Sequence, residues 1–168
     1  MKVMKMKAKL LGTALIFLVI LIACNKDVYS SKPTLKFISV NGDQFKAGDV
    51  VEFKLQVTDK EGDLGSYYSG QDLVWDTVWF QRISKVCPDQ ISDKPSTYAM
   101  PVFTDRSNLK GDLSFTFVFD EIDPSLRYPT LAGRCTLRDD SSYFRFWIKD
   151  RANHVSDTIT SPVITFLK

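Results

Sequence analysis

The sequence contains one histidine, His154, among 168 residues. This scarcity excludes metal sites built from several histidines, and it weakens catalytic mechanisms in which histidine is the general base. The G-x-S-x-G pattern that carries the nucleophile of α/β-hydrolases is absent as well. A hydrolase that uses two carboxylates stays open as the alternative, because the chain has 20 acidic residues. The sequence does not indicate which two of them would form the pair. We therefore expect a protein that is not an enzyme.

No apolar run in the sequence is long enough for a typical membrane-spanning helix. The longest, Leu10 to Ala23, has 14 residues, whereas a span needs about 20. Four lysines and no acid precede this run, and polar residues follow directly after Cys24. A positive segment followed by a short apolar segment is typical of a secretion signal. We expect residues 1–23 to be such a signal.

The end of this run, Leu21-Ile22-Ala23-Cys24, resembles the lipobox of bacterial envelope lipoproteins. The resemblance implies that residues 1–23 are removed and that the Cys24 thiol carries diacylglycerol. It also implies that the new amino terminus is acylated, typically with palmitate, and two or more acyl chains anchor a protein stably in a membrane. In the common sorting scheme, Asp after the lipidated Cys retains a lipoprotein in the inner membrane. Asn25 occupies that position here, which favours the outer membrane and leaves its periplasmic and surface faces open.

Removal of the leader changes the charge of the chain. Four of the 22 Lys and Arg residues lie in the leader, so the mature chain has 18 against 20 acids and a net charge of −2. No mature segment has the clustered positive charge of a nucleic-acid footprint. Nucleic acid is therefore not expected as a partner, whereas the membrane is, through Cys24.

Residues 24–33 are polar and are expected to be a lipidated tether, and residues 34–168 are expected to form one domain. In that domain apolar and polar residues alternate, which is typical of half-buried β-strands, and no convincing helical periodicity appears after Cys24. The expected strands are 35–40, 51–58, 73–83, 97–104 with an interruption at Pro101, 113–119, 142–149 and 158–167. About seven such strands predict an all-β sandwich of the immunoglobulin or fibronectin III type.

Two loops support this fold by resemblance. Residues 57–65 (VTDKEGDLG) and 148–157 (IKDRANHVSD) are similar to strand-exit loops of immunoglobulin-like domains in bacterial envelope lipoproteins. Those loops have patterns close to D-x-x-G-D-x-G and D-x-A-G-N-x-S-D. Here Asn153 stands where glycine is usual, and asparagine tolerates left-handed backbone geometry better than most residues. His154 stands where asparagine is usual.

The acids of these loops offer oxygen ligands for calcium, which takes six to eight of them. The candidate ligands are Asp59, Glu61, Asp63, Asp150 and Asp157. However, the spacing lacks the terminal glutamate of an EF-hand loop. It favours the alternative, in which Asp side chains accept hydrogen bonds from turn amides while Gly62 or Gly65 supplies positive φ. No cofactor is expected on this basis, and calcium stays open.

Secretion also bears on the two remaining cysteines, Cys87 and Cys135. Once Cys24 is acylated they form an even pair in an oxidising compartment, which predicts a disulfide worth about 4 kcal/mol in the chain-entropy model. The alternative is a catalytic thiol, but nothing in the sequence places His154 near either cysteine.

Aromatic residues are the main indication of function. Tyr67 and Tyr68 lie in a Ser/Gly-rich stretch where exposed rings could bind a ligand, with ordinary loop packing as the alternative. Trp75, Trp79 and Trp147 are expected in the core. We expect a lipid-anchored binding or adhesion module of the cell envelope, with a glycan or an envelope protein as partner. The alternative is a structural accessory subunit of an outer-membrane protein assembly, which predicts an apolar face or an open edge strand.

Replacing the lipidated cysteine tests the anchor. Cys24→Ala should move the protein from the membrane fraction to the soluble fraction, because no acyl chain can then be attached. Intact-mass analysis of the wild-type membrane fraction should show diacylglycerol on Cys24. Unchanged membrane retention of the variant would contradict the anchor.

Overall fold

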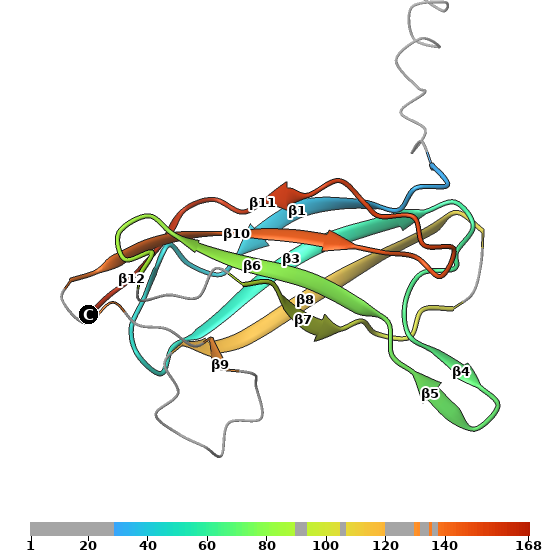
Figure 1. Cartoon of the computed structure of the whole chain (residues 1–168), viewed down its shortest axis with the longest axis horizontal. Coiled ribbons are helices and arrows are strands. Elements are labelled where there is room, and N and C mark those ends of the chain that lie inside the picture. The colour runs from blue at the N-terminus through green and yellow to red at the C-terminus, as the bar shows by residue number, and fades with distance from the viewer. Residues whose placement is uncertain (1–28, 90–93, 105–106, 120–129, 132–134, 136–137) are drawn as a thin grey trace, which may run out of the picture.

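The computed structural model describes residues 29–89, 94–104, 107–119, 130–131, 135 and 138–168. The expected signal peptide, Cys24 and the start of the tether lie outside these residues. Within the described part of the chain, no helix has the length and apolar character needed to cross a membrane. The described chain folds into two β-sheets that face each other, with a small separate hairpin at one end (Figure 1).

The first sheet has the strand order β1-β3-β8-β9, and the second has the order β2-β12-β10-β6-β7, with β11 pairing beside β10. The strands of the first sheet are β1 (Thr34–Val40), β3 (Val50–Asp59), β8 (Leu109–Phe119) and β9 (Thr130–Leu131). Those of the second are β2 (Gln44–Phe45), β6 (Thr77–Ser84), β7 (Ser96–Ala99), β10 (Asp140–Ile148), β11 (Ile159–Thr160) and β12 (Ile164–Phe166). The hairpin consists of β4 (Tyr67–Ser69) and β5 (Asp72–Val74).

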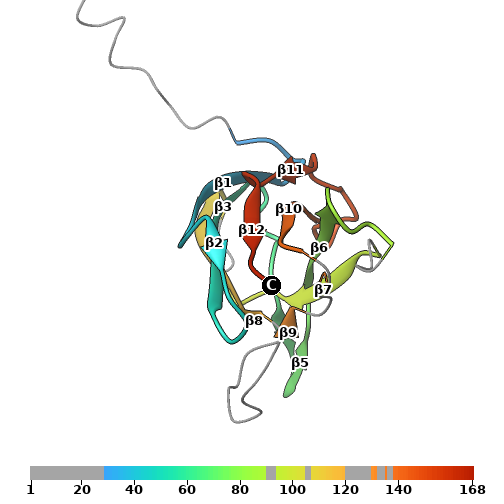
Figure 2. The same cartoon turned by 90° about the vertical axis from the view of Figure 1, so that its left-hand side faces the viewer.

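The two sheets face each other (Figure 2). The core between them is rich in phenylalanine rings. Because side chains alternate between the two faces of a strand, every second residue of β3, β8, β6 and β10 points into this core. The ring of Phe53 on β3 lies 4.7 Å from that of Phe144 and 5.4 Å from that of Phe146, both on β10, between ring centroids. The buried phenylalanines are Phe45, Phe53, Phe80, Phe115, Phe117, Phe119, Phe144, Phe146 and Phe166.

A buried ion pair lies at the end of the sandwich where β10 begins. Arg82 donates a hydrogen bond to Asp140 over 3.0 Å, and both side chains are almost completely buried. The guanidinium of Arg82 also lies over the ring of Phe166, 4.1 Å from its centroid. Close by, Cys87 and Cys135 are joined at disulfide distance, with Cα atoms 5.8 Å apart. The structure therefore brings together the cysteine pair that the sequence predicts.

The prediction of an all-β sandwich is confirmed, and each expected strand region contains a strand of the structure. The prediction of one continuous strand over 73–83 is wrong, because β5 and β6 are separate strands on either side of Asp76. Asp76 accepts hydrogen bonds from the amides of Gly65 and Thr77, and its own amide donates to Ser66 Oγ. These side-chain bonds replace the strand ladder, so the chain passes from the hairpin into the second sheet at this residue.

Two further strands are shorter than expected. β7 ends at Ala99, before Pro101, which has no amide hydrogen for a strand ladder. The last expected strand, 158–167, is divided into β11 and β12, and between them the Ser161 hydroxyl accepts a hydrogen bond from the amide of Phe144.

Candidate functional site

The hairpin of β4 and β5 projects from the end of the sandwich at which β3 ends (Figure 1). It exposes aromatic rings to solvent. Tyr68 on β4 is 65% exposed, and Trp75, directly after β5, is 63% exposed, whereas Tyr67 is half-buried. Two exposed aromatic side chains, Tyr68 and Trp75, therefore lie on this hairpin.

The base of the hairpin is fixed to the sandwich by hydrogen bonds. The Ser66 hydroxyl donates to the Met100 carbonyl over 2.6 Å and accepts from the Asp76 amide over 2.9 Å. The amide of Met100 in turn donates to the Asp76 carbonyl over 2.8 Å. Ser66 and Met100 are buried, so these bonds tie both ends of the hairpin to the segment after β7.

A groove of about 360 Å³ opens beside the hairpin. Trp75 forms one wall, and Asp112 and Ser114 on β8 also line the groove. The side chains of these two residues are bonded to β3, where Gln56 donates to Asp112 Oδ1 and the Ser114 hydroxyl donates to Glu52. The remaining lining residues are mainly apolar and come from β7, β8 and the segment between them: Tyr98, Ala99, Met100, Pro101, Leu113 and Phe115. The groove thus combines an exposed aromatic ring with a mainly apolar lining.

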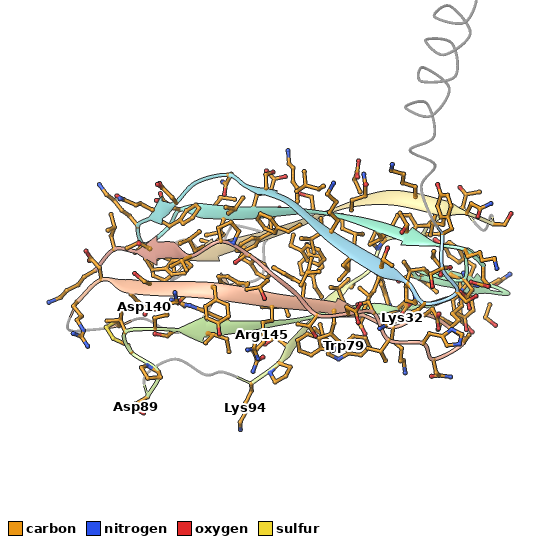
Figure 3. All side chains as sticks on the ribbon, turned by 90° about the horizontal axis from the view of Figure 1, so that it is seen from above. Lys32, Trp79, Asp89, Lys94, Asp140 and Arg145 are labelled. Atoms are coloured by element: carbon orange, nitrogen blue, oxygen red, sulfur yellow. A yellow bond between two sulfur atoms is a disulfide. The ribbon has the colours of Figure 1, made fainter. Side chains whose placement is uncertain are left out.

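The prediction that the three tryptophans lie in the core is wrong. Trp75 is exposed, and Trp79 and Trp147 are only half-buried. On β6 and β10 the inward positions are taken by residues such as Phe80 and Phe146, so the alternation places both tryptophans on the outer face, where they are paired across the two strands. Figure 3 shows Trp79 on the side of the second sheet that faces away from the first.

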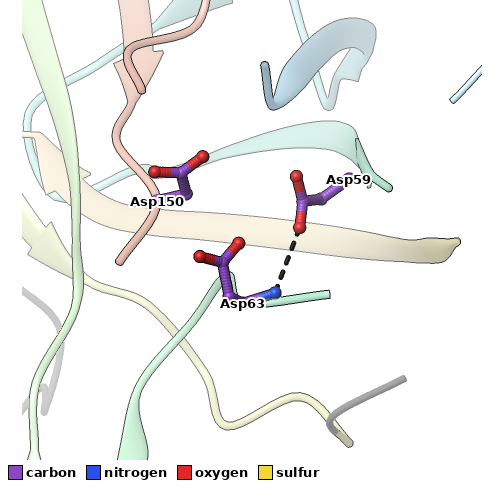
Figure 4. A group of neighbouring side chains, drawn as sticks. All are labelled: Asp59, Asp63 and Asp150. Carbon is purple, nitrogen blue, oxygen red and sulfur yellow. Dashed lines mark hydrogen bonds between the residues drawn. The ribbon is translucent and has the colours of Figure 1, made fainter. Parts of the chain in front are cut away.

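Three carboxylates meet at the base of the hairpin, those of Asp59, Asp63 and Asp150 (Figure 4). Asp59 is the last residue of β3, and Asp150 lies two residues beyond β10. Both continue the inward-facing alternation of their strands and are buried. Asp63 comes from the loop between β3 and the hairpin. One oxygen from each residue lies within 4.8 Å of the others.

Hydrogen bonds satisfy only part of this acidic cluster, defined as Asp59, Asp63 and Asp150. Asp59 Oδ2 accepts from the amides of Gly62 and Asp63, and Asp63 Oδ2 accepts from the amide of Ala152. The other oxygens, Asp59 Oδ1 and Asp63 Oδ1, are buried and have no hydrogen-bond partner among the described residues. Two buried carboxylate oxygens therefore remain unpaired.

His154 is the partner of the third carboxylate. Its amide donates to Asp150 Oδ1 over 2.7 Å, and its ring nitrogen Nδ1 lies 2.9 Å from Asp150 Oδ2. The single histidine of the chain thus orients Asp150. Among the described residues, no contact joins His154 to Cys87 or Cys135. This contact gives no support to the cysteine catalysis that the sequence left as an alternative.

Burial is the main influence on the ionisation of Asp59. It raises the pKa of Asp59 from 3.8 to about 6. The hydrogen bond from the Gly62 amide lowers this pKa, whereas the negative charge of Asp63 raises it. Near neutral pH the cluster therefore holds a carboxylate that the surrounding protein disfavours in its charged form.

The cluster is linked to the hairpin through Arg151. The backbone amide and Nε of Arg151 both donate to the carbonyl of Asp63, over 3.2 and 3.0 Å. Its guanidinium lies over the ring of Tyr67, 4.6 Å from the centroid. The position of the Asp63 loop is thus coupled to the position of β4.

Of the five candidate calcium ligands in the sequence, the structure brings three together, Asp59, Asp63 and Asp150. Glu61 is exposed and does not belong to the cluster, and Asp157 pairs instead with Lys32 over 2.6 Å. The turn interpretation also agrees with the structure, because Gly62, Gly65 and Asn153 have positive φ values of 73°, 100° and 72°. The same loops therefore contain both the hydrogen bonds of the turns and the unpaired carboxylate oxygens.

Sequence reasoning did not identify Trp75 as exposed or Arg151 as the link to the hairpin. Nothing in the sequence marks the role of Arg151, because its contact with Tyr67 joins residues far apart in the chain. A signal for the buried acids was present, however. The apolar alternation that ends in Val57 continues to Asp59, and the one that ends in Ile148 continues to Asp150.

Comparison with known proteins gives no family. No family model and no curated protein matches this chain. Among solved structures, the chain is similar to the sporulation control protein Spo0M from Bacillus subtilis, with 12% identity and a TM-score of 0.43. The match covers 83% of this chain and 51% of that one, so the chain spans about half the length of this relative.

The raised pKa of Asp59 predicts a pH dependence of stability in EDTA. Between about pH 4 and pH 6 the folded protein binds a proton at Asp59 more tightly than the unfolded chain does, so the free energy of unfolding should fall as the pH rises. Asp59→Asn should remove this decrease, whereas Glu61→Gln, at an exposed site, should retain it. Urea unfolding from pH 4 to 7 measures the effect, and identical pH profiles for Asp59→Asn and the wild type would contradict it.

Proposed function

We propose that this protein is a lipid-anchored, non-catalytic binding module of the cell envelope and that the hairpin of β4 and β5 contacts its ligand. The observation that carries the proposal is the exposure of Tyr68 and Trp75 on a projecting hairpin whose base is fixed to the sandwich. Large exposed aromatic groups on a rigid support are common in binding sites. Cys24 is the proposed lipidation site.

The chemistry of the groove favours a glycan as ligand. Trp75 offers a flat ring on which the apolar face of a sugar can stack. Asp112 and Ser114 line the same groove, and their side chains are already bonded to Gln56 and Glu52 on β3. Asp112 is also the only acid among the described residues that line the groove, whereas glycoside hydrolysis usually needs two carboxylates. The groove therefore supports binding better than hydrolysis.

The position of the tether restricts where the ligand would lie. Thr34 pairs with Thr58, next to Asp59, so the chain enters the sandwich at the hairpin end (Figure 1). A chain of eight residue steps from Cys24 to Lys32 spans at most about 29 Å. A lipidated Cys24 would thus hold the hairpin end near the membrane, in the outer membrane if Asn25 directs sorting, and the ligand would be an envelope component close to the bilayer.

A second function is supported by a different surface. The paired Trp79 and Trp147, together with Tyr143 and Ile83, place half-buried apolar side chains on the outer face of β6 and β10. Such a face would suit an accessory subunit of an outer-membrane assembly, which is the alternative proposal. This surface is continuous with solvent-exposed Arg145, and Figure 3 shows Arg145 on the same side as Trp79.

Site-specific photo-cross-linking in the anchored protein tests the proposal. A p-benzoyl-phenylalanine at position 68 should give a discrete adduct with a glycan, and Trp75→Ser should reduce the yield about fivefold or more, because the ligand would lose its stacking partner. The same probe at the exposed Val163 is the matched control and should give no such adduct. Equal products from both positions, or a yield that Trp75→Ser leaves unchanged, would contradict the role of the hairpin. A protein adduct from position 147 alone would favour the accessory subunit.

A further inference from the structure

The acidic cluster of Asp59, Asp63 and Asp150 has the properties of a cation site. Oxygens that bind the same calcium ion at 2.3–2.6 Å can lie no more than about 5 Å apart. One oxygen of each of the three carboxylates lies within 4.8 Å of the others. Figure 4 shows the three side chains close together, each from a different segment of the chain. Their present arrangement therefore allows one ion to contact all three.

A second observation separates this cluster from an ordinary acidic surface. Asp59 is completely buried, and its Oδ1 has no hydrogen-bond partner among the described residues. Asp63 Oδ1 is also buried and unpaired in the described structure. Buried polar groups are nearly always satisfied, and buried charges are usually paired or bound to metal ions. Two unpaired oxygens on neighbouring carboxylates thus indicate a missing positive partner.

The hydrogen bonds that do exist leave these oxygens available. The amides of Gly62 and Asp63 hold Asp59 Oδ2, and the amide of Ala152 holds Asp63 Oδ2. These bonds orient the carboxylates and use one oxygen of each. His154 contacts both oxygens of Asp150, through its amide at Oδ1 and its ring nitrogen Nδ1 at Oδ2, so Asp150 would reach an ion through a remaining lone pair of one of these oxygens. The turn contacts therefore leave one oxygen of Asp59 and one of Asp63 available as ligands.

We propose that Asp59, Asp63 and Asp150 bind one calcium ion at the base of the hairpin. Carboxylate oxygens are hard ligands, which calcium prefers, and water or loop carbonyl groups would complete its six to eight ligands. Magnesium needs a smaller octahedral site with oxygens at about 2.1 Å, which is a poorer match to carboxylates that two separate loops supply. The site does not depend on the proposed lipid anchor or on the identity of the ligand.

Calcium at this position would stabilise the hairpin. The ion would join the end of β3 to the loop after β10, and Arg151 in that loop contacts both the Asp63 carbonyl and the ring of Tyr67. The proposed consequence is that calcium restricts the motion of the segment that carries Tyr68 and Trp75. This consequence rests on the proposed function, whereas calcium binding itself does not.

The test uses the full-length chain in detergent, freed of metal with EDTA, and calcium chloride as the probe. Isothermal titration should give one ion per chain, with a Kd of about 10⁻⁴ to 10⁻³ M or tighter, as in extracellular calcium modules. Calcium at ten times the Kd should raise the melting temperature by about 3 °C or more over EDTA, because the ion binds only the folded state. Magnesium at the same concentration should give a smaller shift.

Two variants in one loop distinguish the site from general acidity. Asp63→Asn should weaken calcium binding at least tenfold, and Glu61→Gln, an exposed acid two residues away, should leave it unchanged. The melting temperature of Asp63→Asn in EDTA establishes whether this variant is folded. No calcium response in the wild type, equal responses in the two variants, or a magnesium response as large as that of calcium would each overturn the proposal. Hairpin cross-linking that persists without calcium would leave the proposed function standing and reject only the coupling.

Discussion

Phenylalanine rings packed between the two sheets hold the sheets face to face, and Phe53 contacts Phe144 and Phe146 at the centre of this packing. These rings belong to β3 and β10, and their packing holds the two strands face to face within the core. Each strand then continues its inward alternation to an acid, Asp59 or Asp150. Apolar packing in the middle of the sandwich therefore brings negative charges together at its end.

Burial of these acids makes their negative charge unfavourable, and hydrogen bonds from the loops compensate this cost only in part. Backbone amides compensate one oxygen of Asp59 and one of Asp63, and two other oxygens stay unpaired in the described structure. Either a proton or a cation can supply the missing positive charge. Burial raises the pKa of Asp59, so the charged carboxylate is disfavoured when neither is bound. At the other end of the sandwich, the positive charge of Arg82 compensates the buried carboxylate of Asp140 directly.

The sequence predicted the parts of the structure that depend on local periodicity. The sandwich, its strand regions and the cysteine pair follow from alternating apolar residues and from cysteine count. The break at Asp76 and the exposure of Trp75 could not be predicted in this way, because the alternation of 73–83 is the same whether the strand is continuous or divided. The acids Asp59 and Asp63 could be identified as turn residues, but their proximity to Asp150 depends on contacts between strands distant in sequence.

The central claim is that a cation at the base of the hairpin controls the segment that carries the exposed aromatic rings. Hydrogen exchange of backbone amides in residues 66–76, measured in calcium and in EDTA, tests it most directly. We predict slower exchange of this segment in calcium for the wild type, no such change in Asp63→Asn, and little change in the centre of β6. Exchange of the hairpin that is the same with and without calcium would contradict the claim.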